Sequence, residues 1–256
     1  MERSRPVAVV SGGSSGIGLA TAQALLAEGW AVALFSQQRA HVETARQALA
    51  TRFGADTIFA DTLDLRDPAA VSGFFGDVSG RFGRIDALIS NAGFSPKRPG
   101  GRTPLGEIAL AEWNDVLSVN LTGALLCCQA VLPGMVERRH GRIILIGSLA
   151  GRTAPRIAGA SYAASKAALA GLARSIVSEY SEYGITANTI CPGRIVTEMT
   201  GEPSSPTNQS ALSRIPAGRL GRPDDIARAV VFLAAPEAGF VNGAVLDVNG
   251  GEFTPA

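Results

Sequence analysis

The sequence predicts an α/β fold in which one parallel sheet of seven strands is covered by helices on both faces. Short apolar runs rich in β-branched residues alternate along the chain with longer segments of helical periodicity. Most of the short runs are continuously apolar instead of alternating between apolar and polar residues, which is typical of strands buried on both faces. The length of 256 residues and a hydrophobic content of 46% suit a single core. We therefore expect one domain spanning residues 1–256.

Seven predicted strands alternate with six predicted helices. The strands are expected at 7–10, 31–35, 57–60, 85–90, 142–146, 186–190 and 244–248. The helices are expected at 17–28, 41–53, 68–82, 110–138, 162–183 and 223–234. This alternation gives a doubly wound sheet with right-handed crossovers, whose ligands bind at the carboxyl ends of the strands. Two irregular segments at this edge, 95–104 and 201–214, are candidate lids, and we expect the stretch 195–215 to line the substrate site.

The composition argues against several classes of function. The formal net charge is +1, so no general field attracts nucleic acid or an anionic membrane. We find no apolar run that approaches the ~18 residues of a membrane span. The three cysteines, Cys127, Cys128 and Cys191, show neither a metal-binding spacing nor the even count of a disulfide framework. We predict small buried thiols in a reducing compartment, and hence a cytoplasmic protein without a bound metal.

A glycine-rich turn, SGGSSGIG at residues 11–18, joins the first predicted strand to the first helix. Phosphate oxygens need close approach to backbone N–H groups, which a Cβ would block, and a helix N-terminus adds a partial positive charge. A tight strand-to-helix connection is the alternative, because the spacing G-x-x-x-G-x-G differs from the G-x-G-x-x-G of dinucleotide folds. The turn predicts a nucleotide site of the Rossmann type. Its residues are Gly12, Ser14, Ser15, Gly16, Ile17 and Gly18.

Tyr162 and Lys166 are four positions apart in a predicted helix, so their side chains lie on one face. A tyrosine with its ordinary pKa near 10 is a poor base at neutral pH, and a nearby ammonium lowers that pKa by favouring the phenolate. The pair therefore predicts an acid/base group, although the same spacing is also common on exposed helices. Asn120 is unexpected for another reason, because it interrupts an apolar stretch of the predicted helix 110–138.

Further short motifs follow the glycine turn in order. They are Ser90-Asn91-Ala92-Gly93, Asn120, Ser148, Tyr162-x-x-x-Lys166, Pro192-Gly193 and Asp247-Val248-Asn249-Gly250-Gly251. Together these motifs resemble the short-chain dehydrogenase/reductase family over essentially the whole chain. Within that family they are most similar to the 3-oxoacyl-[acyl-carrier-protein] reductases. The resemblance implies a nicotinamide-dependent oxidoreductase that interconverts C=O and CH–OH.

The resemblance also implies the catalytic roles. Tyr162 is implied to give a proton to the substrate oxygen in reduction and to accept it in oxidation. Lys166 is implied to tune Tyr162 and to hydrogen-bond the nicotinamide ribose, and Ser148 to hold and polarise the substrate oxygen. The Asn120 side chain is implied to maintain a water that links Lys166 to solvent. Ser148 and Tyr162 are 14 positions apart, one more than is usual, and we expect the loop 152–159 to absorb the extra residue.

Cofactor contacts are implied at the ends of several strands. Asp64 and Leu65 are implied to receive the adenine, with a turn or helix cap as the alternative for Asp64. Asn91 is implied to steady the central sheet, while Ala92 and Gly93 let a ribose lie close. The residues implied to position the nicotinamide are Tyr162, Lys166, Pro192, Gly193, Ile195 and Thr197.

The choice of nicotinamide cofactor depends on the end of the second strand. An acidic residue there would bind the ribose hydroxyls and repel a 2′-phosphate, but the chain has Ser36. Ser36 and Gln37 can donate hydrogen bonds to a phosphate, and Arg39 can supply a charge. Arg39 is equally well explained as a solvated residue at a helix start. The sequence therefore favours NADP(H), with NAD(H) as the alternative.

The leading interpretation is an NADP(H)-dependent carbonyl reductase of a small-molecule substrate, with 3-oxoacyl thioesters among the candidates. The alternative is an NAD-dependent secondary alcohol, sugar or polyol dehydrogenase. A sensor that binds a dinucleotide without turnover is disfavoured, because such proteins often lack the tyrosine or the lysine that this chain keeps.

An acyl carrier protein is a candidate partner. Arg138 and Arg139 stand about where carrier-dependent reductases have a basic residue, but Ser178 stands where a second one is expected. The basic loop 97–102 either attracts an anionic substrate or carrier or is a solubilising surface loop. Because family members usually form tetramers, we also expect a homotetramer.

Overall fold

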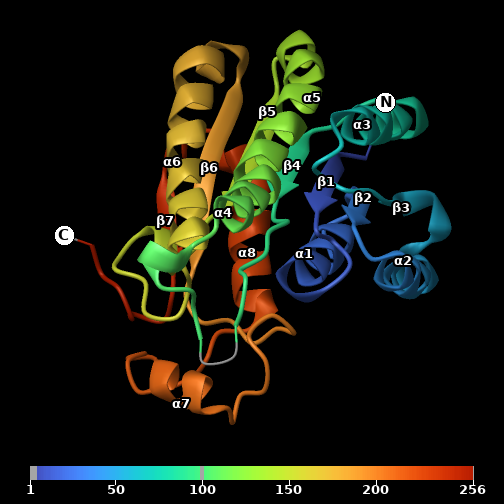
Figure 1. Ribbon diagram of the computed structural model, residues 1–256. Helices are drawn as coiled ribbons and strands as arrows, with labels where there is room; N and C mark the ends of the chain where they lie inside the picture. The colour runs from blue at the N-terminus through green and yellow to red at the C-terminus, as the bar shows by residue number, and fades with distance from the viewer. Residues whose placement is uncertain (1–4, 99–100, 256) are drawn as a thin grey trace.

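The computed structural model describes residues 5–98 and 101–255 (Figure 1). Seven parallel strands form one sheet in the order β3-β2-β1-β4-β5-β6-β7, which confirms the predicted fold class. The strands are β1 (Val7–Ser11), β2 (Ala31–Ser36), β3 (Ile58–Thr62), β4 (Ala87–Ser90), β5 (Gly141–Ile146), β6 (Ile185–Pro192) and β7 (Val245–Val248). The winding changes direction between β1 and β4, and this opens a crevice at their carboxyl ends.

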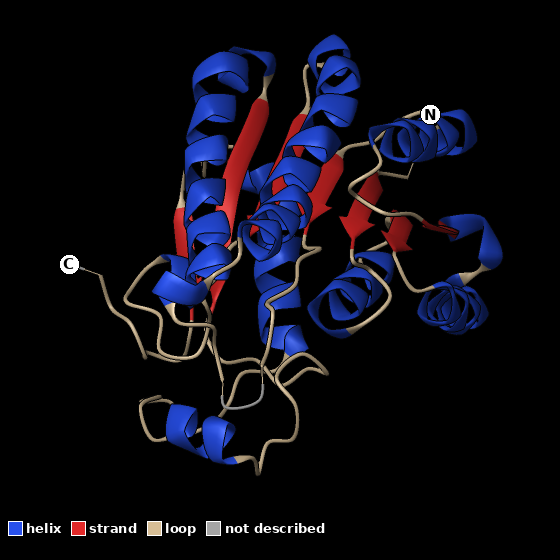
Figure 2. Ribbon diagram, viewed as in Figure 1, coloured by secondary structure: helices blue, strands red, loops and turns tan. Residues whose placement is uncertain are grey.

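Helices cover both faces of the sheet (Figure 2). They are α1 (Gly16–Ala27), α2 (Arg39–Phe53), α3 (Pro68–Phe82), α4 (Leu110–Leu117), α5 (Gly123–Arg138), α6 (Ala160–Tyr180), α7 (Pro206–Leu212) and α8 (Pro223–Ala234). Successive residues of a strand face opposite sides of a sheet. Accordingly, Val7 and Val9 of β1 pack with α3, α5 and α6, whereas Ala8 and Val10 pack with α1, α2 and α8. Two apolar layers thus hold the carboxyl edge of the sheet in place.

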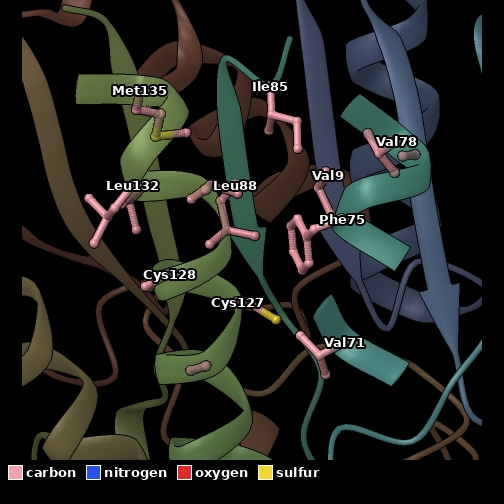
Figure 3. Packing of buried hydrophobic residues seen from close by; sticks show 14 of the residues in the cluster. Val9, Val71, Phe75, Val78, Ile85, Leu88, Cys127, Cys128, Leu132 and Met135 are labelled. Carbon is pink, nitrogen blue, oxygen red and sulfur yellow. The ribbon is translucent and has the colours of Figure 1, made fainter. Parts of the chain in front are cut away.

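The cysteines are part of this packing and not a reactive site. Cys127 and Cys128 on α5 lie among Leu88, Leu132 and other apolar side chains of one layer (Figure 3). All three cysteines are unpaired and buried. Burial raises the pKa of the Cys127 thiol and raises that of Cys128 to about 12. Both thiols are therefore protonated at neutral pH and serve as small apolar groups.

The helix predicted at 110–138 is interrupted in the structure. After α4 the chain forms a π-helical turn, Ser118–Thr122, and α5 begins only at Gly123. Asn120, in the middle of this turn, is 1% exposed. The apolar pattern continues through the turn, so periodicity alone does not reveal the break. Turns of this kind are frequent at functional sites.

By length and hydropathy, the stretch Leu110–Arg138 would also qualify as a membrane span. Burial in the protein core explains the apolar character of this stretch. Cys127, Val131 and Met135 from this stretch are buried against the sheet as part of the core. The helix is thus apolar because it is a central core element.

The segment 201–214 contains the short helix α7, although its polar composition predicts an irregular loop. Pro206 occupies the first turn of α7, and Ser205 caps the helix because its side chain accepts a hydrogen bond from the Asn208 backbone N–H at 3.4 Å. Asn208 is fully buried. The Ser-Pro start signal was present in the sequence but was outweighed by the surrounding polar residues.

Candidate active site

A cavity of about 660 Å³ lies at the carboxyl edge of the sheet, and we call it the nucleotide cavity. It extends from the turn after β1 to the segment after β6. The predicted site residues in its wall are Gly12, Ser15, Gly16, Ile17, Ser36, Gln37, Asp64, Leu65, Asn91, Ala92, Gly93, Ser148, Tyr162, Lys166, Pro192, Gly193, Ile195 and Thr197. The structure therefore brings together most of the residues that the sequence singles out.

Four predicted residues lie outside this wall: Ser14, Gly18, Arg39 and Asn120. Ser14 and Gly18 are buried residues of the glycine turn. A Cβ on Gly18 would lie 2.1 Å from the Gly12 carbonyl oxygen, so this glycine lets α1 pack directly against the turn. Arg39 is an exposed residue at the start of α2. The cofactor contacts expected of Ser14, Gly18 and Arg39 therefore stay predictions.

The glycine turn has the shape of a phosphate cradle. Gly12 and Gly16 have φ values of +63° and +50°, in the left-handed region that favours glycine. A Cβ on Gly12 would lie 3.0 Å from the Cα of Ala92, so the turn lies directly against the segment after β4. α1 has no side-chain cap and no acidic residue in its first turn. The helix N-terminus is therefore open to an anion, and the turn fits the pyrophosphate of a dinucleotide.

Asn91 holds the crevice between β1 and β4. Its backbone N–H donates to Ser11 Oγ at 2.9 Å. Its side-chain Nδ2 donates to the carbonyls of Ser11 at 3.1 Å and Gly12 at 3.2 Å. These bonds fasten the end of β4 to the glycine turn, in keeping with the steadying role that the resemblance implies.

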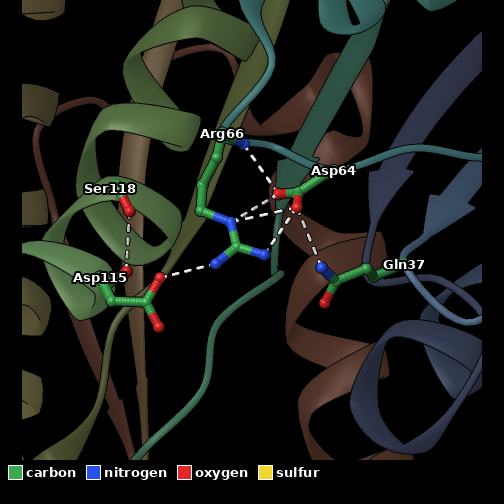
Figure 4. Close-up of polar contacts among 5 residues, drawn as sticks. All are labelled: Gln37, Asp64, Arg66, Asp115 and Ser118. Atoms are coloured by element: carbon green, nitrogen blue, oxygen red, sulfur yellow. Dashed lines mark hydrogen bonds and ion pairs between the residues drawn. The ribbon is translucent and has the colours of Figure 1, made fainter. Parts of the chain in front are cut away.

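A polar network borders the end of the nucleotide cavity near β2 and β3 (Figure 4). The Asp64 carboxylate accepts hydrogen bonds from Arg66 Nη2 at 2.6 Å and Gln37 Nε2 at 3.0 Å. Arg66 Nη1 also donates to Asp115 Oδ1 at 2.7 Å. The Arg66 guanidinium holds the pKa of the Asp64 carboxyl below its ordinary value. Arg66 was missed in the sequence, and the only available signal was its place two residues after Asp64.

Ser148, Tyr162 and Lys166 meet at the other end of the cavity. Lys166 is 4% exposed, and its Nζ donates to the Ile146 carbonyl at 2.8 Å. The Lys166 Nζ lies 5.9 Å from the Tyr162 ring centroid. The Tyr162 phenol forms a hydrogen bond with the Ser148 side chain. A short 3₁₀ turn, Leu149–Gly151, and the loop that follows absorb the 14-position gap.

Burial controls the protonation of this group. Loss of water raises the pKa of the Tyr162 phenol, and the hydrogen bond with Ser148 only partly offsets this effect. Burial also lowers the pKa of Lys166 to about 8. The direction for Tyr162 is opposite to the lowering expected from the ammonium, because the cost of desolvating the phenolate dominates. Tyr162 is therefore a protonated phenol at neutral pH, which suits it to donate a proton.

The pH dependence of stability should reveal the buried lysine. Between about pH 8 and 10.5, a lysine in the unfolded chain stays protonated while Lys166 in the folded protein loses its proton. The unfolded state then binds more protons, so the free energy of unfolding should gain a rising contribution with pH across this window. Lys166→Met should lack that contribution. Urea unfolding of both proteins from pH 7 to 10 gives the comparison.

The only other lysine of the chain supplies the control for this measurement. Lys97 is exposed, so Lys97→Met should follow the wild-type pH dependence. Parallel curves for the wild type and Lys166→Met would contradict a lowered pKa at Lys166.

The Asn120 side chain is fully engaged with its neighbours. Its Oδ1 accepts from the Phe94 backbone N–H at 2.9 Å, and its Nδ2 donates to the Phe94 carbonyl at 3.0 Å and to Ser165 Oγ at 3.1 Å. Both amide hydrogens are used, while Oδ1 keeps one lone pair, so the expected contact with a relay water stays a prediction. A Cβ on Gly93 would lie 3.1 Å from both Asn120 Oδ1 and Lys166 Nζ. Asn120 thus positions the loop after β4 against α6.

The segment after β6 closes the cavity on the side predicted for the nicotinamide. A parallel bridge pairs Ile195 with Gly221, and Thr200 Oγ1 donates to the Ile195 carbonyl at 2.8 Å. Thr197 reaches the glycine turn, since a Cβ on Gly16 would lie 3.2 Å from its Cγ2. Ile195 and Thr197 therefore belong to a fixed loop that faces the phosphate cradle.

A second cavity of about 460 Å³ adjoins the first and shares Ser148, Tyr162 and Gly193 with it. We call it the substrate chamber. Its wall includes Leu149, Ala150 and Ile157, whereas Phe94 lines the nucleotide cavity. Charged residues in its wall are Lys97, Arg98, Arg156, Arg194, Arg214 and Glu252. The shared Ser148 and Tyr162 place the acid/base group between the two cavities.

The described cations of the basic loop, Lys97, Arg98 and Arg102, all have partners. Lys97 Nζ donates to the Met199 carbonyl, and Arg102 Nη1 donates to the Pro155 carbonyl. Arg98 pairs with Glu107 and Glu112, at 3.8 Å in each case. Lys97 and Arg102 thus connect the loop to two other segments of the chamber wall, while Arg98 is paired outside it.

Comparison of the sequence and the fold with known proteins identifies the protein family. Residues 12–252 match the family described as Enoyl-(Acyl carrier protein) reductase. The chain belongs to the short-chain dehydrogenase/reductase family, as its motifs indicate.

Three relatives illustrate the similarity. The chain is 38% identical to the 3-oxoacyl-[acyl-carrier-protein] reductase of Escherichia coli, covering 96% of this chain and 97% of the relative. It is also 38% identical to the acetoacetyl-CoA reductase of Shinella zoogloeoides, with coverage of 96% and 98%. A blue fluorescent protein from a metagenomic library, solved in complex with NADPH, superimposes with a TM-score of 0.88 at 33% identity, with coverage of 97% and 98%.

Proposed function

We propose that this protein is an NADP(H)-dependent carbonyl reductase that converts C=O to CH–OH, with 3-oxoacyl thioesters among its candidate substrates. The observation that carries the proposal is the meeting of Ser148, Tyr162 and Lys166 at the junction of the nucleotide cavity and the substrate chamber. The names of the relatives support it, since two of them reduce 3-oxoacyl or acetoacetyl thioesters.

The residues of the junction have separate tasks. The chemistry that NADP(H) supplies when bound is hydride transfer to or from the substrate carbon. Ser148 donates a hydrogen bond to the substrate oxygen, where negative charge develops. Tyr162 gives its phenolic proton to that oxygen, so that the new O–H bond forms as the phenolic O–H breaks. Lys166, one helical turn away, stabilises the resulting phenolate by its charge.

The proposed preference for NADP(H) depends on the polar network near β2 and β3. Ser36 ends β2 without a carboxylate to repel a 2′-phosphate. Arg66 lines the same end of the cavity and neutralises Asp64. Arg66 thus takes the role that the sequence predicts for Arg39.

Two arginine variants should separate these assignments. Arg66→Gln is expected to lower the ratio of kcat/KM for NADPH to that for NADH by about tenfold, the effect of one charge-assisted hydrogen bond. Arg39→Gln should leave the ratio unchanged, because Arg39 is exposed and outside the cavity wall. Steady-state kinetics with both cofactors provides the measurement. A change confined to Arg39→Gln would reverse the assignment.

The function itself is tested by a cofactor-oxidation screen over 3-oxoacyl thioesters, cyclic ketones and sugars. NADPH oxidation with ketones or thioesters is the expected result. Activity confined to NAD⁺ and secondary alcohols, sugars or polyols would favour the alternative dehydrogenase. Equal turnover of acyl-carrier and simple ketone substrates would remove the carrier protein as a partner. The two basic residues at the place where carrier-dependent reductases have one already have partners in the chain. Arg138 donates to the Ile85 carbonyl, and Arg139 donates to the Glu182 carbonyl.

The proposal also covers the location, the domain organisation and the oligomeric state of the protein. We propose a cytoplasmic homotetramer in which residues 1–256 form one domain and the stretch 195–215 lines the substrate site. Exposed apolar side chains support an assembly: Leu125 on α5, Phe232 on α8, Leu246 on β7, and the fully exposed Phe240. Light scattering would report a mass about four times that of the 26.4 kDa chain.

A further inference from the structure

The substrate chamber carries a strong local charge in a nearly neutral protein. The formal net charge of the whole chain is +1. Among the described residues, the chamber wall nevertheless contains five cations and one carboxylate, Glu252. A partly enclosed cavity with low-dielectric walls focuses such a charge and raises the local concentration of anions. The chamber wall thus has an excess of positive charge, which favours a negatively charged group.

Most of these cations already have partners. Lys97 donates to the Met199 carbonyl, and Arg98 pairs with Glu107 and Glu112. Arg214 Nε lies 3.2 Å from Glu252 Oε1. Arg156 is an exposed residue of the loop 152–159.

Arg194 differs from the other cations. Within the part of the chain that the structure describes, it forms no ion pair. It follows Gly193, which lines both cavities, so Arg194 lies beside the junction that holds Tyr162. Its guanidinium interacts electrostatically with Glu252 in the chamber wall, and burial lowers its pKa.

A buried amide holds the Arg194 guanidinium in place. Arg194 Nε donates to Asn208 Oδ1 at 2.7 Å, and Nη2 donates to the Thr200 carbonyl at 3.2 Å. Asn208 is 0% exposed, and its Nδ2 donates to the carbonyls of Thr200, Gly201 and Glu202. Asn208 of α7 and the Thr200 carbonyl thus fix two nitrogens of the guanidinium. Nη1 has no acceptor among the described residues, so it keeps two N–H groups for a ligand.

We propose that Arg194 binds a carboxylate of the substrate through Nη1, so that this enzyme reduces oxo acids in preference to neutral ketones. The inference builds on the proposed reductase function and names its substrate class. A preorganised, partly desolvated guanidinium forms a strong charge-assisted hydrogen bond with a carboxylate. The apolar Leu149, Ile157 and Met199 in the chamber wall fit the carbon chain of such an acid.

Matched substrates test the proposal. The acids 3-oxobutanoate, 4-oxopentanoate and 5-oxohexanoate place the carboxylate at increasing distances from the ketone, and their methyl esters keep the ketone but remove the charge. We expect the wild type to favour at least one acid over its ester in kcat/KM. Arg194→Met should lower kcat/KM for that acid by about 10- to 100-fold and change the ester less than about threefold. Arg194→Lys should keep part of the preference, because it keeps the charge.

A distant arginine and a second substrate pair complete the design. Arg52→Met, on the exposed face of α2, should leave both acid and ester kinetics unchanged. A 3-oxobutanoyl-CoA and its N-acetylcysteamine analogue differ in their phosphates. A loss in Arg194→Met confined to the CoA thioester would mean that the anion is a phosphate and would overturn the carboxylate assignment. Equal losses for acid and ester would show that Arg194 only supports α7.

Calorimetry separates this inference from the proposed function. Titration of 5-oxohexanoate, 4-oxopentanoate and 3-oxobutanoate into the wild type and Arg194→Met measures binding without turnover. Binding of an acid that is lost in Arg194→Met supports the carboxylate site even if no ketone is reduced, in which case only the reductase function fails. Reduction of neutral ketones together with equal binding by both proteins would overturn the carboxylate site and leave the reductase function standing.

Discussion

Tyr162→Phe is expected to lower kcat for ketone reduction by about 10²- to 10⁴-fold, the range for loss of a positioned general acid. The variant removes only the phenolic oxygen, which is the atom placed between the two cavities next to Ser148. Without it the substrate oxygen must take its proton from water, while Ser148 still provides a hydrogen bond. The affinity for NADPH should change little, because the turn, the polar network and Lys166 stay in place.

The chain offers a matched control for this change. Tyr180 near the end of α6 packs against Tyr183, with ring centroids 6.5 Å apart, far along the helix from the junction. Tyr180→Phe removes the same atom and should keep full activity. Circular dichroism and NADPH fluorescence would confirm that both variants fold and bind the cofactor. Undiminished turnover by Tyr162→Phe would remove the proposed mechanism.

Much of the fold could be read from the sequence because the fold depends on regular patterns. β1 and β5 are buried along their whole length, and each contains a continuous apolar run, VAVV at 7–10 and IILI at 143–146. The π-helical turn and α7 were missed for opposite reasons. The turn keeps the apolar periodicity of its neighbours, while α7 is short and polar, so that its Ser205-Pro206 start was the only signal.

Some residues of the site could be identified from the sequence, and others could not. Residues tied to a local motif, such as Gly12, Tyr162 and Lys166, were found because their spacing along the chain sets their geometry. Arg66 and Arg194 were missed because their roles arise from tertiary contacts. Arg66 reaches Asp115 on α4, and Arg194 is held by Asn208 on α7. No spacing rule connects such residues, since the loops that bring them together have no periodic pattern.

The pKa of Tyr162 could not be obtained from spacing either. Four positions on a helix predict an ammonium beside the phenol, but they do not predict how deeply the pair is buried. The structure shows that loss of water is the larger effect at both residues. The sequence thus identified the chemical groups, while their protonation depended on the packing of α6 against β5.

Gly18→Ala is expected to have the other large effect, on nucleotide affinity and stability together. The new Cβ would lie 2.1 Å from the Gly12 carbonyl oxygen and 2.7 Å from Asn91 Nδ2. Neither contact is tolerable, and the nearer atom belongs to the backbone, so the glycine turn must shift away from α1. We expect the dissociation constant for NADPH to rise at least about tenfold, and overpacking of this kind to cost about 1–3 kcal/mol of stability.

The opposite result is expected when the same substitution is made at an exposed helical glycine. A Cβ on Gly76 of α3 would meet no atom within 4 Å, so Gly76→Ala should raise stability by about 0.5–1 kcal/mol by reducing the freedom of the unfolded chain. Fluorescence titration with NADPH and thermal unfolding of both variants measure the contrast. If Gly18→Ala also gained stability and bound NADPH normally, then α1 would not press on the turn, and the phosphate cradle would have to be explained without this helix–turn contact.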